Sequence, residues 1–136
     1  LLAVVPRDHR LASLPRFPIK EVEHEPFISL LETSDHDARR ALEAAGVTPN
    51  IRYTTKDDYA IIAMVEQGLG VSIMPELLLS GRSDNVRVME LTPPASRTIG
   101  LCLPDADRAG PATLRFADCV SDWVREHYSR LQNTLS

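Results

Sequence analysis

Hydroxyl and carboxylate side chains gather at two places where an apolar, strand-like run gives way to a helix-like one. The first stretch runs from Ser29 to Asp35, and the second from Thr54 to Asp58. Free N–H groups at a helix N-terminus attract anions, and ligands of open α/β sheets collect at the carboxyl ends of strands. The pattern therefore suits an anion-binding site. Asp35, Asp57 and Asp58 equally suit plain helix caps that need no ligand.

Catalytic and metal-binding patterns are not found in the sequence. A nucleophile, histidine and acid can be assembled from Ser29, His36 and Asp35, but the serine does not lie in a nucleophile elbow. The histidines lack the HExxH spacing of a zinc site. Gly68-x-Gly70 follows a helix instead of preceding one, so we expect it to shape the backbone and not to hold a phosphate. We expect no enzyme activity, no metal and no cofactor.

The composition narrows the class of protein. The 136 residues suffice for one domain or one lobe of a larger protein, and the net charge of −4 argues against a nucleic-acid-binding module. No apolar run reaches the roughly 18–20 residues that span a bilayer, so we expect a cytoplasmic protein without a membrane segment. The start at Leu1, inside a strand-like run, indicates a piece of a longer chain. Cys102 and Cys119 are predicted to be buried free thiols.

Apolar runs alternate with helical periodicity, which is typical of an α/β fold with a mostly parallel sheet. We expect a helical turn over 19–23, a helix that starts within 33–35 and ends at Gly46, and another capped by Thr55 or Asp57. Two further helices are expected over 76–79 and about 111–128. The predicted strands cover residues 1–5, 26–31, 51–54, 71–74, 86–91 and 98–103.

In this order, the segments resemble the effector-binding region of LysR-type transcriptional regulators. Val4–Ala12 is similar to the family's V-x-P-x-x-H-P-L-A, with Arg10 in place of the usual proline. Val65–Pro75 is similar to V-x-x-G-x-G-[IV]-x-x-[LM]-P, which is the strongest match. Further matches are Glu25–Ile28, Gly46–Pro49, Arg97–Leu101 and the helix from Phe116 to Val124.

The resemblance implies a periplasmic-binding-protein-like (type 2) fold, whose Rossmann-like lobes are mixed, mostly parallel sheets flanked by helices. Residues 1–85 would form a nearly complete second lobe, and residues 86–136 would return to an incomplete first lobe. A small, anionic metabolite would bind between the lobes and modulate transcription. DNA would be contacted only by a winged helix-turn-helix outside this chain, in a parent protein that assembles as a dimer or tetramer.

The resemblance also implies which residues contact the effector. Ser29 and Leu30, at the end of the second strand, are the first candidates. Four more lie near the two helix starts: Thr33, Ser34, Thr54 and Thr55. Two alternatives remain open from the sequence. One is a solute-binding protein of a transport system, which shares the fold, and the other is an enzyme lobe like that of prephenate dehydratase or hydroxymethylbilane synthase, for which a catalytic set is missing.

Overall fold

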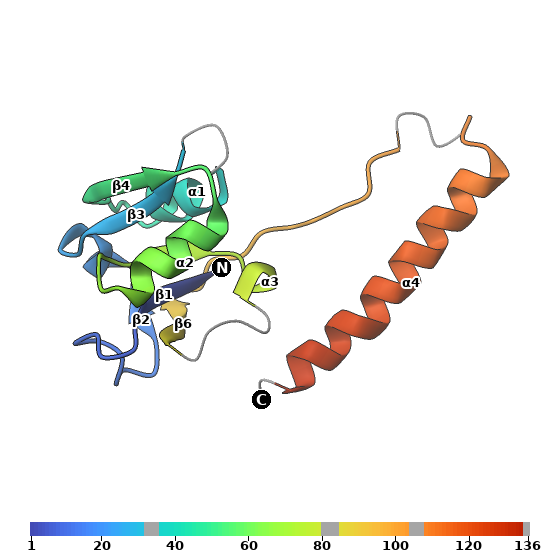
Figure 1. Ribbon diagram of the computed structural model, residues 1–136. Coiled ribbons are helices and arrows are strands. Elements are labelled where there is room, and N and C mark those ends of the chain that lie inside the picture. The colour runs from blue at the N-terminus through green and yellow to red at the C-terminus, as the bar shows by residue number, and fades with distance from the viewer. Residues whose placement is uncertain (32–35, 80–84, 104–107, 135–136) are drawn as a thin grey trace. The chain divides into compact units, whose positions relative to one another are not determined.

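The computed structural model describes residues 1–31, 36–79, 85–103 and 108–134, with side chains described as far as residue 127. The chain divides into two compact units, Leu1–Arg97 and Thr98–Ser136 (Figure 1). The candidates Thr33 and Ser34 lie outside the described residues. The pocket described below belongs wholly to the first unit.

The first unit alternates strands with short helices, as the periodicity predicts. The expected strands and helices of this unit are confirmed, with ends that differ by one or a few residues, except that the helix start predicted within 33–35 lies outside the described residues. The short β2 is an additional strand in a segment that we expected to be loop. The elements are β1 (Leu2–Pro6), β2 (Phe17–Pro18), the 3-10 helix η1 (Ile19–Glu23), β3 (Phe27–Leu30), α1 (His36–Ala44), β4 (Ile51–Thr55), α2 (Asp58–Glu66), β5 (Ser72–Met74), α3 (Glu76–Leu79) and β6 (Val86–Thr92).

The strands form a mixed arrangement. Four of them lie in the order β2-β6-β1-β5, and β3 pairs with β4 separately. The β2–β6 and β3–β4 pairs are parallel, as is a single bridge between Phe27 and Val71. β1 runs antiparallel to both of its neighbours, β5 and β6. The α/β class with a mixed sheet is thus confirmed, but the four-stranded sheet is not mostly parallel, because β1 pairs antiparallel with both of its neighbours. The direction of β1 could not be foreseen, because pairing between distant runs leaves no local signal.

Alternation along the strands divides the core into two clusters. Phe27 belongs to the cluster that contains Ala38 and Leu42 of α1, whereas its neighbour Ile28 belongs to the cluster that contains Ile61 of α2. The two helices therefore cover opposite faces of β3, and α2 lies in front of that strand in Figure 1. Both clusters consist almost entirely of aliphatic side chains.

Two glycines shape the turn between α2 and β5 for different reasons. Gly68 has φ +73°, which confirms that it ends the helix in the left-handed region. Gly70 does not need a positive φ; instead, a Cβ at this position would lie 2.3 Å from the carbonyl oxygen of Pro26. Its role is therefore a close approach between two chain segments.

Substituting Gly70→Ala should lower the free energy of unfolding by about 1–3 kcal/mol, because the new methyl group must displace backbone. Urea unfolding measures this change. Gly100→Ala is the control, since no atom lies within 4 Å of the Cβ it would add. Equal unfolding midpoints for the two variants would contradict the close-approach explanation.

The second unit differs from the expectation in two respects. The predicted strand over 98–103 is wrong: these residues take no regular structure, because no described strand pairs with them. The expected closing helix is present as α4 (Pro111–Thr134). The cysteines are free, as predicted, but exposed and not buried. Their burial was predicted from packing that this unit does not form: Phe116 and Trp123 of α4 are 65% and 55% exposed.

Candidate functional site

The carboxyl ends of β3 and β4 bring four of the candidate residues together. In the parallel ladder Ser29 pairs with Thr54 and Leu30 pairs with Thr55. The N–H of Leu31 donates to the carbonyl oxygen of Thr55 at 2.9 Å, which holds the two strand ends in register. The adjacency expected at this edge of the sheet is therefore present.

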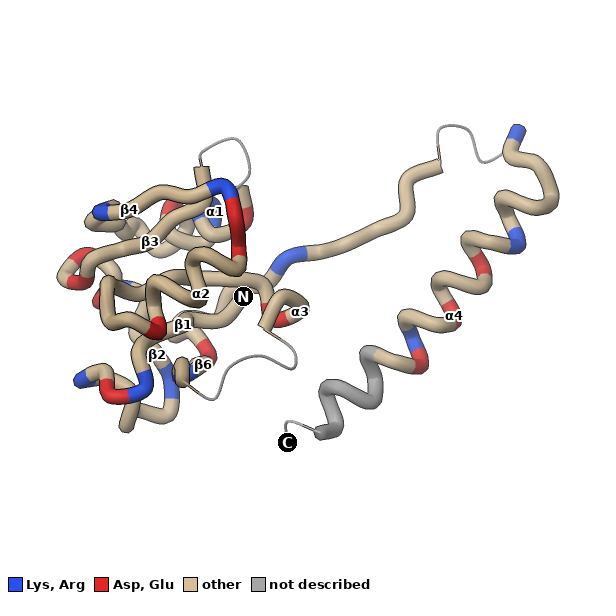
Figure 2. Tube along the Cα trace, in the orientation of Figure 1, with Lys and Arg blue, Asp and Glu red and all other residues tan. Residues whose placement is uncertain are grey.

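The polar groups after β4 cap α2 without any ligand. The N–H of Asp57 donates to Thr55 Oγ1 at 3.1 Å, and Asp57 Oδ1 accepts the N–H of Tyr59 at 2.8 Å. Figure 2 shows this acidic start of α2 in red. The capping interpretation is thus confirmed for Asp57, and the helix dipole already meets a fixed carboxylate there.

A pocket of about 180 Å³ lies at the end of β3, between the first turns of α1 and α2 and along β5. Leu30 is the only candidate among those described that lines it. Ser29 is buried, and its Oγ donates to the carbonyl oxygen of Leu30 at 2.9 Å. The pocket is lined by Leu1, Leu30, Asp37, Ala38, Asp58, Ile61, Ser72, Ile73, Met74, Pro75, Leu78 and Arg97.

Ser29 lines a neighbouring pocket instead. This second pocket, of about 290 Å³, lies between α1 and the start of β4, and Leu30 borders it as well. Thr54 and Thr55 belong to the lining of neither pocket. The four described candidates therefore lie at one edge of the β3–β4 pair, and Leu30 is the one among them that lines both pockets.

Three polar side chains of the first pocket were not selected from the sequence. Arg97 Nη1 lies 3.3 Å from Asp37 Oδ2, so one cation and one anion face each other at its rim. Ser72, which is buried, donates from Oγ to the carbonyl oxygen of Ile28 at 2.7 Å. The residues come from distant parts of the chain, and only a knowledge of the strand pairing could have brought them together.

A fourth polar group of this pocket has no partner. Asp58 Oδ1 is buried from solvent, and no hydrogen-bond donor reaches it within the described part of the chain. The sequence places Asp58 beside the capping residue Asp57, so it was expected to serve the helix start. The structure separates the two neighbours, because one caps the helix and the other borders the pocket.

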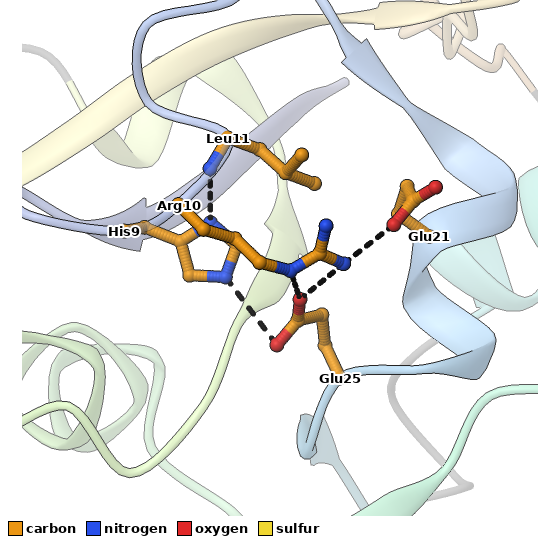
Figure 3. A network of polar contacts seen from close by, with 5 residues as sticks. All are labelled: His9, Arg10, Leu11, Glu21 and Glu25. Atoms are coloured by element: carbon orange, nitrogen blue, oxygen red, sulfur yellow. Dashed lines mark hydrogen bonds and ion pairs between the residues drawn. The ribbon is translucent and has the colours of Figure 1, made fainter.

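A network around Arg10 positions the chain that leads into β3. Arg10 donates from Nε to Glu25 Oε1 at 2.8 Å and from Nη2 to Glu21 (Figure 3). The hydrogen bonds to Glu21, and next to Glu25, raise the pKa of the Arg10 guanidinium above its usual value. His9 Nδ1 accepts the N–H of Leu11, while its Nε2 lies 3.3 Å from Glu25 Oε2 without hydrogen-bond geometry.

Replacing Arg10 should weaken the first unit, because its one guanidinium connects two carboxylates from different segments. We expect Arg10→Met to lower the urea midpoint of unfolding, and the loss to shrink in concentrated salt. Arg16→Met is the matched control: Arg16 makes one exposed pair with Glu90, and such pairs contribute about 0–1 kcal/mol. Similar midpoints for both variants would show that the network adds nothing.

The described residues contain neither a membrane-spanning helix nor a metal-binding cluster. None of the helices in this part of the chain is both long and apolar enough to cross a bilayer. Histidine, cysteine and acidic side chains do not gather in threes as a metal ion would require, again within the described residues.

The mixed sheet, the helices on its two faces and the pocket at a strand end define a periplasmic-binding-protein-like (type 2) lobe. The chain belongs to the LysR substrate binding domain family, whose profile matches residues 1–125. It is thus an effector-binding domain of a LysR-type regulator. The resemblance found in the sequence is confirmed, and so is the expectation that the chain is not an enzyme, because the family is not enzymatic.

Known proteins agree with this assignment. The chain is 30% identical over 124 residues to YvbU, an uncharacterized HTH-type transcriptional regulator of Bacillus subtilis. This alignment covers 89% of the chain and 42% of YvbU. HinK, a LysR family regulator from Pseudomonas aeruginosa, is similar in structure with a TM-score of 0.67 and 28% identity, covering 86% of this chain and 42% of HinK. The chain therefore spans less than half of each of these regulators.

A third comparison supports the fold alone. The effector binding domain of QuiR in complex with shikimate has a TM-score of 0.68 and 20% identity, covering 93% of this chain and 61% of the QuiR domain.

Proposed function

We propose that this chain senses a small, anionic metabolite for a LysR-type transcriptional regulator. The observation that carries the proposal is the pocket at the end of β3, bordered by the first turns of α1 and α2 and by Arg97. Arg97 supplies a guanidinium that an anionic group can meet. That the related QuiR domain was solved with shikimate supports a small-molecule effector.

In this proposal the first unit, Leu1–Arg97, whose sheet includes β6, is the second lobe, and the residues after it return to a first lobe. The effector contacts are assigned to the carboxyl edge of β3 and β4. Leu30 has the strongest support because it lines the pocket, and Ser29 lies next to it. Thr54 and Thr55, which line neither pocket, remain proposed contacts from the sequence, as do Thr33 and Ser34, which lie outside the described residues.

Sensing would act through a population shift. An effector that touches both lobes stabilises one lobe orientation, and it can bias the regulator only by its differential affinity for the two states. DNA contact would fall to a helix-turn-helix domain of the cytoplasmic parent protein. A solute-binding protein, the alternative with the same fold, is not favoured, because the family found is that of the regulators.

The proposal predicts that pooled metabolites raise the melting temperature of the chain. A ligand at 100 times its Kd adds about 2.7 kcal/mol of stability. Leu30→Trp should remove the shift by filling the pocket, whereas Leu31→Trp, at a 37% exposed position outside it, should keep the shift. Thermal melts of the three proteins measure this. A mixture that never shifts the wild-type chain contradicts a sensor function.

A homo-oligomeric parent is proposed as well, and β4 supports it. This strand is an edge strand with exposed residues along its length, including Ile51 at 50% and Tyr53 at 41% exposure. An exposed edge strand offers its backbone groups for pairing with another chain. We assign this edge to contact with a second copy.

Ile51→Lys should therefore shift the full regulator to a smaller species in sedimentation velocity, because a charged side chain on an edge strand opposes pairing. Leu14→Lys is the control, since Leu14 is a similarly exposed apolar residue away from β4. An unchanged sedimentation coefficient for Ile51→Lys would remove β4 from the interface.

A further inference from the structure

The pocket beside α2 contains donors that are engaged and an acceptor that is not. Arg97 faces Asp37, the Ser72 hydroxyl donates to the carbonyl oxygen of Ile28, and the backbone nitrogen of Leu1 donates to the carbonyl oxygen of Ala95 at 2.8 Å. Asp58 Oδ1, in contrast, receives no hydrogen bond from the described residues although it is buried from solvent.

An unpaired buried carboxylate oxygen calls for an explanation. Buried polar groups are hydrogen-bonded in the great majority of cases, and an ionised carboxylate can only accept. The adjacent Asp57 shows that a carboxylate at this helix start can find a backbone donor, since it accepts the N–H of Tyr59. Asp58 instead borders the cavity, where a ligand could supply the missing donor.

The remaining walls define the rest of such a ligand. Leu30, Ile61 and Leu78 line the same pocket with aliphatic side chains, which suit a branched apolar group. Arg97 keeps N–H groups beyond the one that faces Asp37, because a guanidinium carries five. A carboxylate of the ligand can therefore meet Arg97 while another group meets Asp58.

The geometry points to Asp58 as the specificity residue of the pocket: the effector is a small carboxylic acid that also presents a hydroxyl or ammonium donor to Asp58 Oδ1. This inference rests on the proposed function and narrows its ligand class. A ligand with such a donor gains a hydrogen bond to this oxygen that an anion without the donor does not form, so the two classes of ligand differ in affinity.

Three probes of one carbon skeleton test the inference: leucine carries an ammonium, leucate a hydroxyl and isocaproate neither. In calorimetric titrations of the full chain, we expect leucine or leucate to bind at least about tenfold more tightly than isocaproate. Asp58→Ala should abolish the difference. Asp58→Asn keeps an acceptor oxygen but loses the charge, so it should retain binding of leucate and weaken that of leucine, which identifies the donor.

Asp57→Asn is the matched control. It alters the cap of α2 and not the pocket, so the preference among the probes should persist in it. The inference is overturned when the wild-type chain binds the three probes equally, binds none of them, or keeps its preference in Asp58→Ala. The pooled-metabolite melts separate the two proposals. If metabolites raise the melting temperature of the wild-type chain but not of Leu30→Trp, while the three probes show no preference, the role of Asp58 is wrong and the sensor function stands.

Discussion

The contact between the segment before β3 and the segment before β5 joins the β3–β4 pair to the four-stranded sheet of the first unit. The N–H of Val71 donates to Pro26 at 2.9 Å, and the N–H of Ile28 donates to Val71 at the same distance. The Ser72 hydroxyl adds a third bond to Ile28. Gly70 permits the approach, because any side chain would collide with Pro26. Since β3 leads into the pocket and β5 forms its wall, the site depends on this junction.

The electrostatics of the site are arranged around the same strand. Before β3, Arg10 connects two carboxylates and thereby fixes the chain that leads into it. After β3, the first turns of α1 and α2 each carry an aspartate: Asp37 faces Arg97, and Asp58 Oδ1 receives no hydrogen bond from the described part of the chain. The strand is thus held by satisfied charges at its start and ends beside a carboxylate oxygen that is not satisfied.

Local sequence patterns predicted most helices and strands of the first unit. They did not predict features that depend on contacts between residues far apart in the sequence. Asp57 was recognised as a cap because capping involves residues only two positions apart. The strand over 98–103 was wrong, because an apolar run becomes a strand only if a partner pairs with it. In the site, Leu30 follows from its place at a strand end. Ser72 and Arg97 line the same pocket but come from distant parts of the chain, so no local pattern predicts them. Asp58 was assigned to helix capping together with Asp57, and only the structure shows that it borders the pocket.

The position of β1 has a consequence for how the protein is made. β1 lies between β5 and β6 in the sheet, and it precedes both of these strands by a long stretch of chain. During synthesis, the backbone of Leu2–Pro6 therefore lacks one or both of its strand partners until the chain has been extended through Thr92. Contacts so distant in sequence slow folding, and an exposed strand during that interval is prone to aggregate. We therefore expect nascent chains to depend on chaperones more than the small size of the unit would suggest.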